Sequence, residues 1–419
     1  SNHFYIHYDI EGIHAPDLTD EYGINSNTPN NIPDYIDEVA LMADNVRQIM
    51  VNQFNFLEEI DDSDGVYDIY IKNKGYYNYG INIPDNEIPG ASYIEIDNKY
   101  EEGSYYTSGL NTMRLTLAHE YFHAIQRSYN SPSFGHGYFW EMSATFIEDV
   151  IVPDGNDYIF WVDSFFENPN VNISSTDGYS IALFGHYLND VVGNGNVSII
   201  REIWENYSIS NNPFISIKSI LENNYGTTFQ YTWSDFTSRN FFNGDYQNMN
   251  NDIYYYIDQK DVIPISLLYS NLSNPDILNE TITINDLLLT NESSDHIAFS
   301  ISELSSINLE HFSSDELEGF VSIKSNQNIN LNKHIYIDEY LSDIHLGQED
   351  VLFFTYASYN TEFIDVVINY SSNISYQGDC SLDDEIDILE KEIVCIPIGW
   401  WLSKKNREYI IQIIKNFIM

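Results

Sequence analysis

The chain contains 419 residues, too many for one small module, and 43% of them are hydrophobic, which excludes a globally disordered protein. Its 17 Lys and Arg stand against 64 Asp and Glu, and the resulting formal net charge of −47 disfavours binding to nucleic acids or anionic membranes. No apolar run approaches the length of about 18 residues that a membrane helix needs, so we expect no membrane insertion.

The first 258 residues combine strand and helix patterns. Alternating apolar residues predict strands at 2–9, 66–72 and 92–97. Apolar spacings of three and four predict helices at 34–56 and 112–129, and Asp34 is the expected N-cap of the first. Further helical patterns occupy 139–150, 179–192, 197–207, 214–224 and 231–241.

The pattern changes near residue 261 to short apolar runs between Asn, Ser and Asp clusters, which is typical of an all-β sandwich. The expected strands are 280–289, 296–301, 320–323, 351–357 and 363–370. Residues 376–419 form an acidic loop followed by helical spacing. We therefore predict an α+β protein with a first domain at 1–258, a β-sandwich at 259–375 and a short helical tail at 376–419.

Residues 119–123 read His-Glu-Tyr-Phe-His within the helix expected at 112–129. Two imidazoles at i and i+4 project from one face and can bind one zinc ion, while Glu120 can reach a water at that ion. The pattern therefore favours His119 and His123 as metal ligands and Glu120 as a catalytic base. The alternative is an ordinary helix face that happens to carry these residues.

A catalytic zinc needs a third protein ligand. The metzincin pattern would require Gly and His at positions that hold Gln126 and Tyr129, so that class is excluded. Glu141 follows His123 by eighteen residues, enough for a reversal of the chain and one turn of a partner helix, so it can face the histidines. His136 is the rival third ligand.

Glu148 lies two turns beyond Glu141 and can hydrogen-bond a ligand histidine, with a surface carboxylate as the alternative. Together, HEYFH and WEMSATFIE resemble the gluzincin signature of thermolysin-like proteases and zinc aminopeptidases. In the aminopeptidases a Glu ligand follows a Trp and precedes an Ala by three residues and a second Glu by seven. Glu141, Ala144 and Glu148 repeat that spacing.

A closer resemblance, over residues 2–205, is to a group of secreted bacterial proteins classed as metalloproteases. The shared segments, in order, are HFYIHYDIEGIHAPD, NNIPDYID, VYDIYIK, SYIEIDN, LTLAHEYFHAIQ and WEMSATFIEDVIVP. The resemblance implies a secreted zinc peptidase with His119, His123 and Glu141 as ligands and Glu120 as general base toward the water that attacks an extended peptide.

The oxyanion of such a reaction needs a further donor, and the candidates are Tyr179 and His186 on the helix expected after the third ligand. Tyr179 matches a Tyr of the resembling family and is preferred. Ser92–Asp97 resembles the gluzincin edge strand that pairs with the substrate, the alternative being an internal strand of the same sheet.

The tail carries a calcium-loop pattern that resembles half of a dockerin repeat, although Asp384 stands where the sharp turn favours Gly. Its predicted ligands are Asp379, Ser381, Asp383, Asp387 and Glu390. An acidic helix cap is the alternative. The tail thus suggests calcium as a second metal and a cell-surface or scaffold partner.

Two weaker features complete the pattern. Residues 25–37 resemble a second calcium loop, or form a plain Asn-rich turn before the helix at Asp34. Cys380 and Cys395 could form a disulfide or remain free thiols.

The sequence therefore favours an extracellular zinc metallopeptidase that cleaves peptides or proteins. Two rivals remain open. One is a non-enzymatic adhesion or matrix-binding protein with a structural or vestigial zinc site, and the other is a zinc hydrolase acting on something other than peptides. A fourth protein ligand to the zinc would favour the first rival.

Overall fold

The chain divides into a compact unit, Ser1–Ser375, and a second unit, Tyr376–Met419. The computed structural model describes residues 3–16, 32–75, 78–103, 106–168, 171–250, 252–265, 281–289, 292–300, 305–313, 319–325, 328–337, 340–346, 350–358 and 362–373. The predicted tail loop at 379–390, both cysteines and residues 25–31 of the second predicted calcium loop lie outside these ranges. Within the described part of the chain, no helix has the length and apolar character that crossing a bilayer requires.

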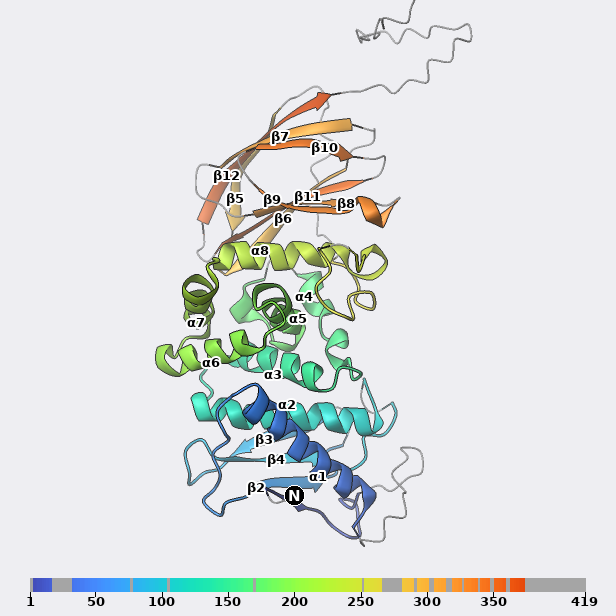
Figure 1. Ribbon diagram of the computed structural model, residues 1–419, viewed down its shortest axis with the longest axis vertical. Helices are drawn as coiled ribbons and strands as arrows, with labels where there is room; N and C mark the ends of the chain where they lie inside the picture. The colour runs from blue at the N-terminus through green and yellow to red at the C-terminus, as the bar shows by residue number, and fades with distance from the viewer. Residues whose placement is uncertain are drawn as a thin grey trace, which may run out of the picture. The chain divides into compact units, whose positions relative to one another are not determined.

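A four-stranded sheet, in the order β1-β2-β4-β3, opens the compact unit (Figure 1). The strands β1 (Phe4–His7), β2 (Tyr67–Lys72) and β4 (Ser92–Asp97) run parallel, and β3 (Gly80–Pro84) pairs antiparallel with β4. The predicted strand at 92–97 is therefore correct in its bounds, but it is an internal strand. The edge beside it is β3, which the sequence patterns did not predict.

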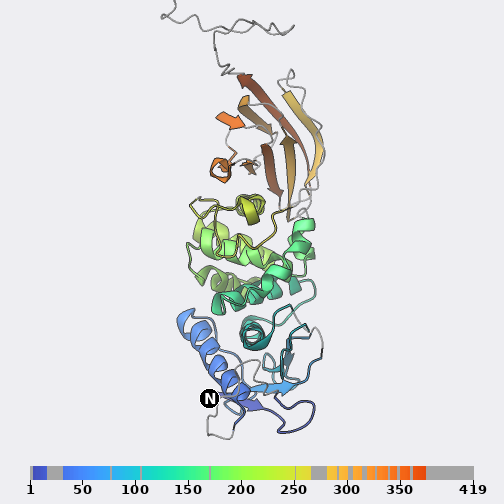
Figure 2. The same ribbon diagram turned by 90° about the vertical axis from the view of Figure 1, so that its right-hand side faces the viewer.

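Two helices, α1 (Asp34–Arg47) and α2 (Gly109–Tyr129), pack on this sheet, and α3 (Gly137–Ile151) packs on α2. Helix α2 packs against β3 and β4 on one side and against α1 and α3 on others, so it is buried almost all round. In Figure 2 α2 is seen end-on, with the sheet below it.

The start of α1 differs from the prediction. Pro33 occupies the cap position and Asp34 is the first helical residue. There the negative charge of the Asp34 carboxylate interacts favourably with the positive end of the helix dipole. The helix then widens into a π-helical segment, Gln48–Gln53, which accounts for the longer helix expected from apolar spacing.

The next part of the chain is helical, as predicted. Its helices are α4 (Asp163–Glu167), α5 (Ala182–Tyr187), α6 (Ser198–Ser210), α7 (Pro213–Ile220) and α8 (Phe229–Arg239). Side-chain caps fix two of these starts, because Asn212 accepts a hydrogen bond from the Ile215 amide and Thr228 one from the Tyr231 amide. The fully buried Trp204 and Trp233 fill the core between the helices.

The remaining strands form two four-stranded antiparallel sheets, β10-β7-β12-β5 and β6-β11-β8-β9. Their bounds are β5 (Thr281–Leu289), β6 (Ser293–Ser300), β7 (Ser305–Ser313), β8 (Gly319–Lys324), β9 (Lys333–Tyr336), β10 (Tyr340–Leu346), β11 (Val351–Ser358) and β12 (Glu362–Asn373). Helix α8 packs on β8 and β11. The α+β class is confirmed, since helices and sheets occupy successive stretches of the chain.

Candidate metal centre

Helix α2 places the His-Glu-x-x-His residues at its buried centre. His119 and His123 are one turn apart, with ring centroids 4.7 Å from each other. Glu120 is also buried, and this burial raises the pKa of its carboxyl group. The charges of His119 and His123 oppose this rise, and that of Glu141 adds to it.

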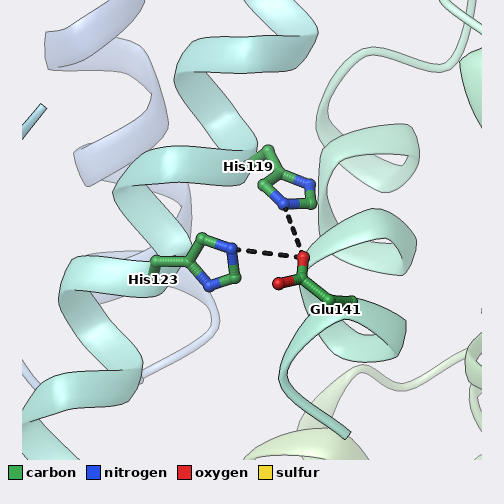
Figure 3. A group of neighbouring side chains, drawn as sticks. All are labelled: His119, His123 and Glu141. Carbon is green, nitrogen blue, oxygen red and sulfur yellow. Dashed lines mark hydrogen bonds and ion pairs between the residues drawn. The ribbon is translucent and has the colours of Figure 1, made fainter. Parts of the chain in front are cut away.

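Glu141 comes from α3, which returns antiparallel after the connection at 130–136 and packs along α2. Its Oε2 lies 3.1 Å from Nε2 of His119 and 3.4 Å from Nε2 of His123 (Figure 3). Burial alone would raise the pKa of Glu141, but the two histidines hold it well below its usual range. In the described ranges, these three side chains are the one His/Cys/Asp/Glu group that could hold a metal, with one donor atom of each within 4.8 Å of the others.

The second nitrogen of each ring is already engaged. His119 Nδ1 lies 2.7 Å from Glu148 Oε2, and His123 Nδ1 lies 2.6 Å from Gln126 Oε1. Because both partners are acceptors there, each Nδ1 carries a proton, so Nε2, which faces Glu141, is the nitrogen of each ring that can release its proton and bind a metal. With both Nε2 atoms deprotonated, three acceptor atoms converge on one point, an arrangement that a bound cation would satisfy.

The structure brings Glu148 to His119, as the sequence suggested. Burial raises the pKa of Glu148 to about 7, although the His119 ring opposes the rise. A carboxylate behind a ligand histidine orients the ring and increases its basicity.

Gln126 is the corresponding partner of His123, and sequence reasoning missed this role. Its Nε2 donates to the Trp140 carbonyl at 3.0 Å and to Ser143 Oγ at 3.1 Å, which leaves Oε1 facing His123. Its position three residues after His123, on the same helix face, was the available signal.

Tyr179 reaches the centre on a tight turn. Gly178, at φ +92°, approaches α3 so closely that a Cβ would lie 2.5 Å from the Tyr138 carbonyl oxygen and 2.7 Å from Glu141 Cβ. The ring of Tyr179 then lies parallel to that of His119, with centroids 5.8 Å apart. Burial, together with the Glu141 carboxylate to which the hydroxyl donates, raises the pKa of Tyr179 far above its ordinary value.

Two other candidates lie elsewhere. His186 Nε2 is 3.4 Å from Asp149 Oδ2, its ring packs on Phe146 and Tyr158, and burial lowers its pKa to about 3. The ring of His136 faces Tyr207, with Nδ1 2.9 Å from the hydroxyl oxygen. Neither histidine joins the group formed by His119, His123 and Glu141.

The edge strand β3 runs directly beside the turn of α2 that carries Glu120. A Cβ on Gly80 would lie 2.6 Å from Thr116 Cγ2 and 3.1 Å from Glu120 Cγ, so only glycine lets the strand approach this closely. Asn82 Nδ2 donates to the Glu120 carbonyl at 3.3 Å, and Arg127 Nε donates to Asn82 Oδ1 at 2.5 Å. These contacts fix β3, the edge strand of this sheet among the described residues, next to Glu120.

The sequence matches the profile of DUF6055, a family of unknown function, over residues 22–284, and the chain belongs to that family. The match spans all the residues of the candidate metal centre. No curated protein sequence matches the chain.

Proposed function

We propose that this protein is a zinc-dependent peptidase of gluzincin type. The observation that carries the proposal is the convergence of His119 Nε2, His123 Nε2 and Glu141 Oε2, while the opposite nitrogen of each ring is held by Glu148 or Gln126. Two imidazoles and one carboxylate are a donor set that zinc accepts in hydrolases.

The number of ligands favours catalysis over a structural metal. Structural zinc sites are closed by four protein ligands, whereas catalytic sites keep one position for water or substrate. Among the described residues, no fourth His, Cys, Asp or Glu completes the group. This favours the enzyme over an adhesion protein with a structural zinc.

Zinc, when bound by the three donors, supplies a Lewis acid that polarises the scissile carbonyl and lowers the pKa of water. Glu120 accepts a proton from the attacking water and returns it to the leaving nitrogen as the C–N bond breaks. Its raised pKa suits both steps, because a carboxyl group that is too acidic would hold the proton poorly.

Tyr179 is the candidate donor to the carbonyl oxygen that becomes negative during the attack. Its raised pKa keeps the hydroxyl protonated, so it can donate throughout the cycle. His186 is not needed for this role, since its contacts are with Asp149 and the rings behind α3.

An extended peptide is the substrate that the neighbouring strand suits best. Among the described strands β3 pairs with β4 alone, so its other edge presents main-chain groups beside Glu120, although the Asn82 carbonyl already accepts a hydrogen bond from Arg127 Nη2 at 3.5 Å. Peptide recognition by strand addition uses such groups. This assigns to β3 the role that sequence reasoning gave to Ser92–Asp97.

The finer architecture is part of the same proposal. The resemblance of the motifs supports a gluzincin layout for the sheet and helices up to α8, and the two antiparallel sheets that follow support a β-sandwich accessory domain. Export from the cell and calcium binding by the tail rest on the sequence patterns alone.

The test combines metal analysis with cleavage of casein and of a mixed peptide library. Purified protein is expected to hold about one zinc per chain and to lose cleavage on addition of 1,10-phenanthroline. Glu120→Gln should keep the zinc and lower the cleavage rate by about 10²–10⁴-fold. The matched control is Glu205→Gln, an exposed carboxylate on α6, which should cleave like wild type. Cleavage by metal-free protein, or full activity in Glu120→Gln, would refute the proposal.

A further inference from the structure

A row of aromatic rings leads from the metal centre to the surface. Tyr179, whose ring lies over His119, contacts Trp161 at a centroid distance of 5.3 Å. Trp161 contacts the ring of Tyr106 edge-on at 5.3 Å, and Tyr106 stacks on Phe160 at 5.0 Å. The outer two rings are open to solvent, since Tyr106 is 52% exposed and Phe160 51% exposed.

Hydrogen bonds fix the Trp161 side chain and the backbone at Tyr106. Buried Asp157 accepts hydrogen bonds from Trp161 Nε1 at 3.2 Å and from the Tyr79 hydroxyl at 3.3 Å. The Tyr79 hydroxyl in turn accepts the backbone N–H of Tyr106 at 2.9 Å. An aromatic surface whose Trp161 side chain and Tyr106 backbone are fixed by hydrogen bonds is partly pre-ordered for a ligand, which reduces the entropy lost on binding.

The position of the rings along the edge strand indicates which part of a bound peptide would lie next to them. Tyr79 immediately precedes β3, Gly80 lies beside Glu120, and Asn82 lies further along α2 toward Arg127. A peptide that pairs antiparallel with β3, the more stable pairing, runs from Asn82 toward Tyr79. The peptide residues after the scissile bond therefore lie on the side of the aromatic rings.

We propose that Tyr106, Phe160 and Trp161 form a subsite for a large apolar side chain, above all an aromatic one, on the carboxyl side of the scissile bond. This inference rests on the proposed peptidase function and adds its specificity. The residues are uncharged, they are continuous with the centre through Tyr179, and an aromatic side chain can stack on the Tyr106–Phe160 pair or meet it edge-on.

The first experiment maps cleavage sites in a mixed peptide library by mass spectrometry. Wild type should cleave before Phe, Tyr or Trp about 10-fold more often than before Ser, since discrimination by an apolar pocket is of this order. The double variant Tyr106→Ser with Phe160→Ser should reduce this ratio to within about 2-fold while its zinc content and melting temperature stay close to wild type. The matched control is Tyr5→Ser on β1, at the opposite edge of the sheet, whose ring is 61% exposed. It should keep the wild-type ratio.

The second experiment measures binding without turnover. In zinc-loaded Glu120→Gln protein, peptides that differ only by Phe, Ser or Arg after the intended scissile bond are titrated by calorimetry. Phe should bind about 10-fold more tightly than Ser, and this difference should vanish when the Tyr106 and Phe160 substitutions are added.

The outcomes separate the two proposals. Three outcomes would refute the subsite and leave the peptidase function unaffected. They are cleavage and binding without an aromatic preference, an aromatic preference that persists in the double variant, and a preference for Arg. A zinc-loaded wild-type protein that neither cleaves nor binds any of these peptides would overturn the peptidase function, and the subsite with it.

Discussion

At the scale of single residues, the centre is defined as much by the groups behind the histidines as by the histidines themselves. Glu148 and Gln126 each take up one ring nitrogen, and they differ in charge. The carboxylate of Glu148 makes His119 more basic, whereas the neutral amide of Gln126 mainly orients His123. Both contacts turn the Nε2 atom of a ring toward Glu141.

We predict that Gln126→Met lowers zinc affinity by about 10–100-fold, because methionine fills the space of glutamine but gives the His123 Nδ1–H no strong acceptor. Competition against a chromophoric chelator measures the affinity. The matched control is Gln53→Met at an exposed site, which should bind zinc as wild type does. Equal affinity in the two variants would contradict the role assigned to Gln126.

Gly178 offers a second prediction. Gly178→Ala should destabilise the protein by about 1–3 kcal/mol, because the new Cβ would collide with the Tyr138 carbonyl oxygen and Glu141 Cβ. Gly12→Ala is the matched control, since Gly12 has almost the same φ, +94°, and no atom lies within 4 Å of the place its Cβ would take. Urea unfolding compares the two. If Gly178→Ala lowers the free energy of unfolding no more than Gly12→Ala does, the space between Gly178 and α3 can accommodate a Cβ and the prediction is wrong.

At the scale of elements, Asp235 ties α8 to its neighbours. It accepts hydrogen bonds from Tyr187 on α5 at 2.7 Å, from Arg239 at 2.9 Å and from His334 on β9 at 2.5 Å. Burial alone would raise its pKa, but the His334 hydrogen bond and the Arg239 charge hold the pKa of Asp235 at about 2. Removing this carboxylate would leave Arg239 as a buried charge without its partner.

Asp235→Asn should therefore destabilise the protein by about 3–5 kcal/mol near pH 7. A folded-state pKa below the unfolded value of about 3.9 means that the ionised group stabilises the fold above pH 4 and loses this effect as pH falls toward 2. The difference in the free energy of unfolding between wild type and variant, measured with urea, should become smaller as the pH falls from 4 to 2. Exposed Asp245→Asn is the control. A difference that stays constant over this range would contradict the assignment.

The elements also show how far local patterns reach. Alternation correctly predicted the strand Ser92–Asp97, yet not its place in the sheet, because an internal strand and an edge strand can carry the same alternation. The edge strand Gly80–Pro84 escaped notice since its Gly, Asn and Pro are typical of loops, and a free edge tolerates them. Similarly, an Asp at the start of a helix is typical of an N-cap residue, but in the structure Pro33 occupies the N-cap position and Asp34 is the first helical residue.

At the scale of the whole molecule, the net charge of −47 means strong self-repulsion. We predict that the melting temperature rises by several degrees between about 0.01 M and 1 M salt, as the screening length shortens from roughly 30 Å to roughly 3 Å. Differential scanning calorimetry in sodium chloride and in choline chloride tests this. Similar shifts in both salts are expected from screening, and a shift in only one would indicate binding of a specific ion instead.

Periodicity and spacing within single helices were enough to predict the α+β class, the helix that carries His119, Glu120 and His123, and the candidacy of Glu141 and Glu148. Three further relations were established by the folded chain, although the spacing of His123 and Gln126 within one helix offered a signal for the first. Gln126 rather than a charged group backs His123, β3 forms the edge beside Glu120, and Tyr106 and Phe160 continue the line of rings from Tyr179. Most of these relations join residues from separate elements, and the packing of helices and strands, which no local pattern records, sets the distances between them.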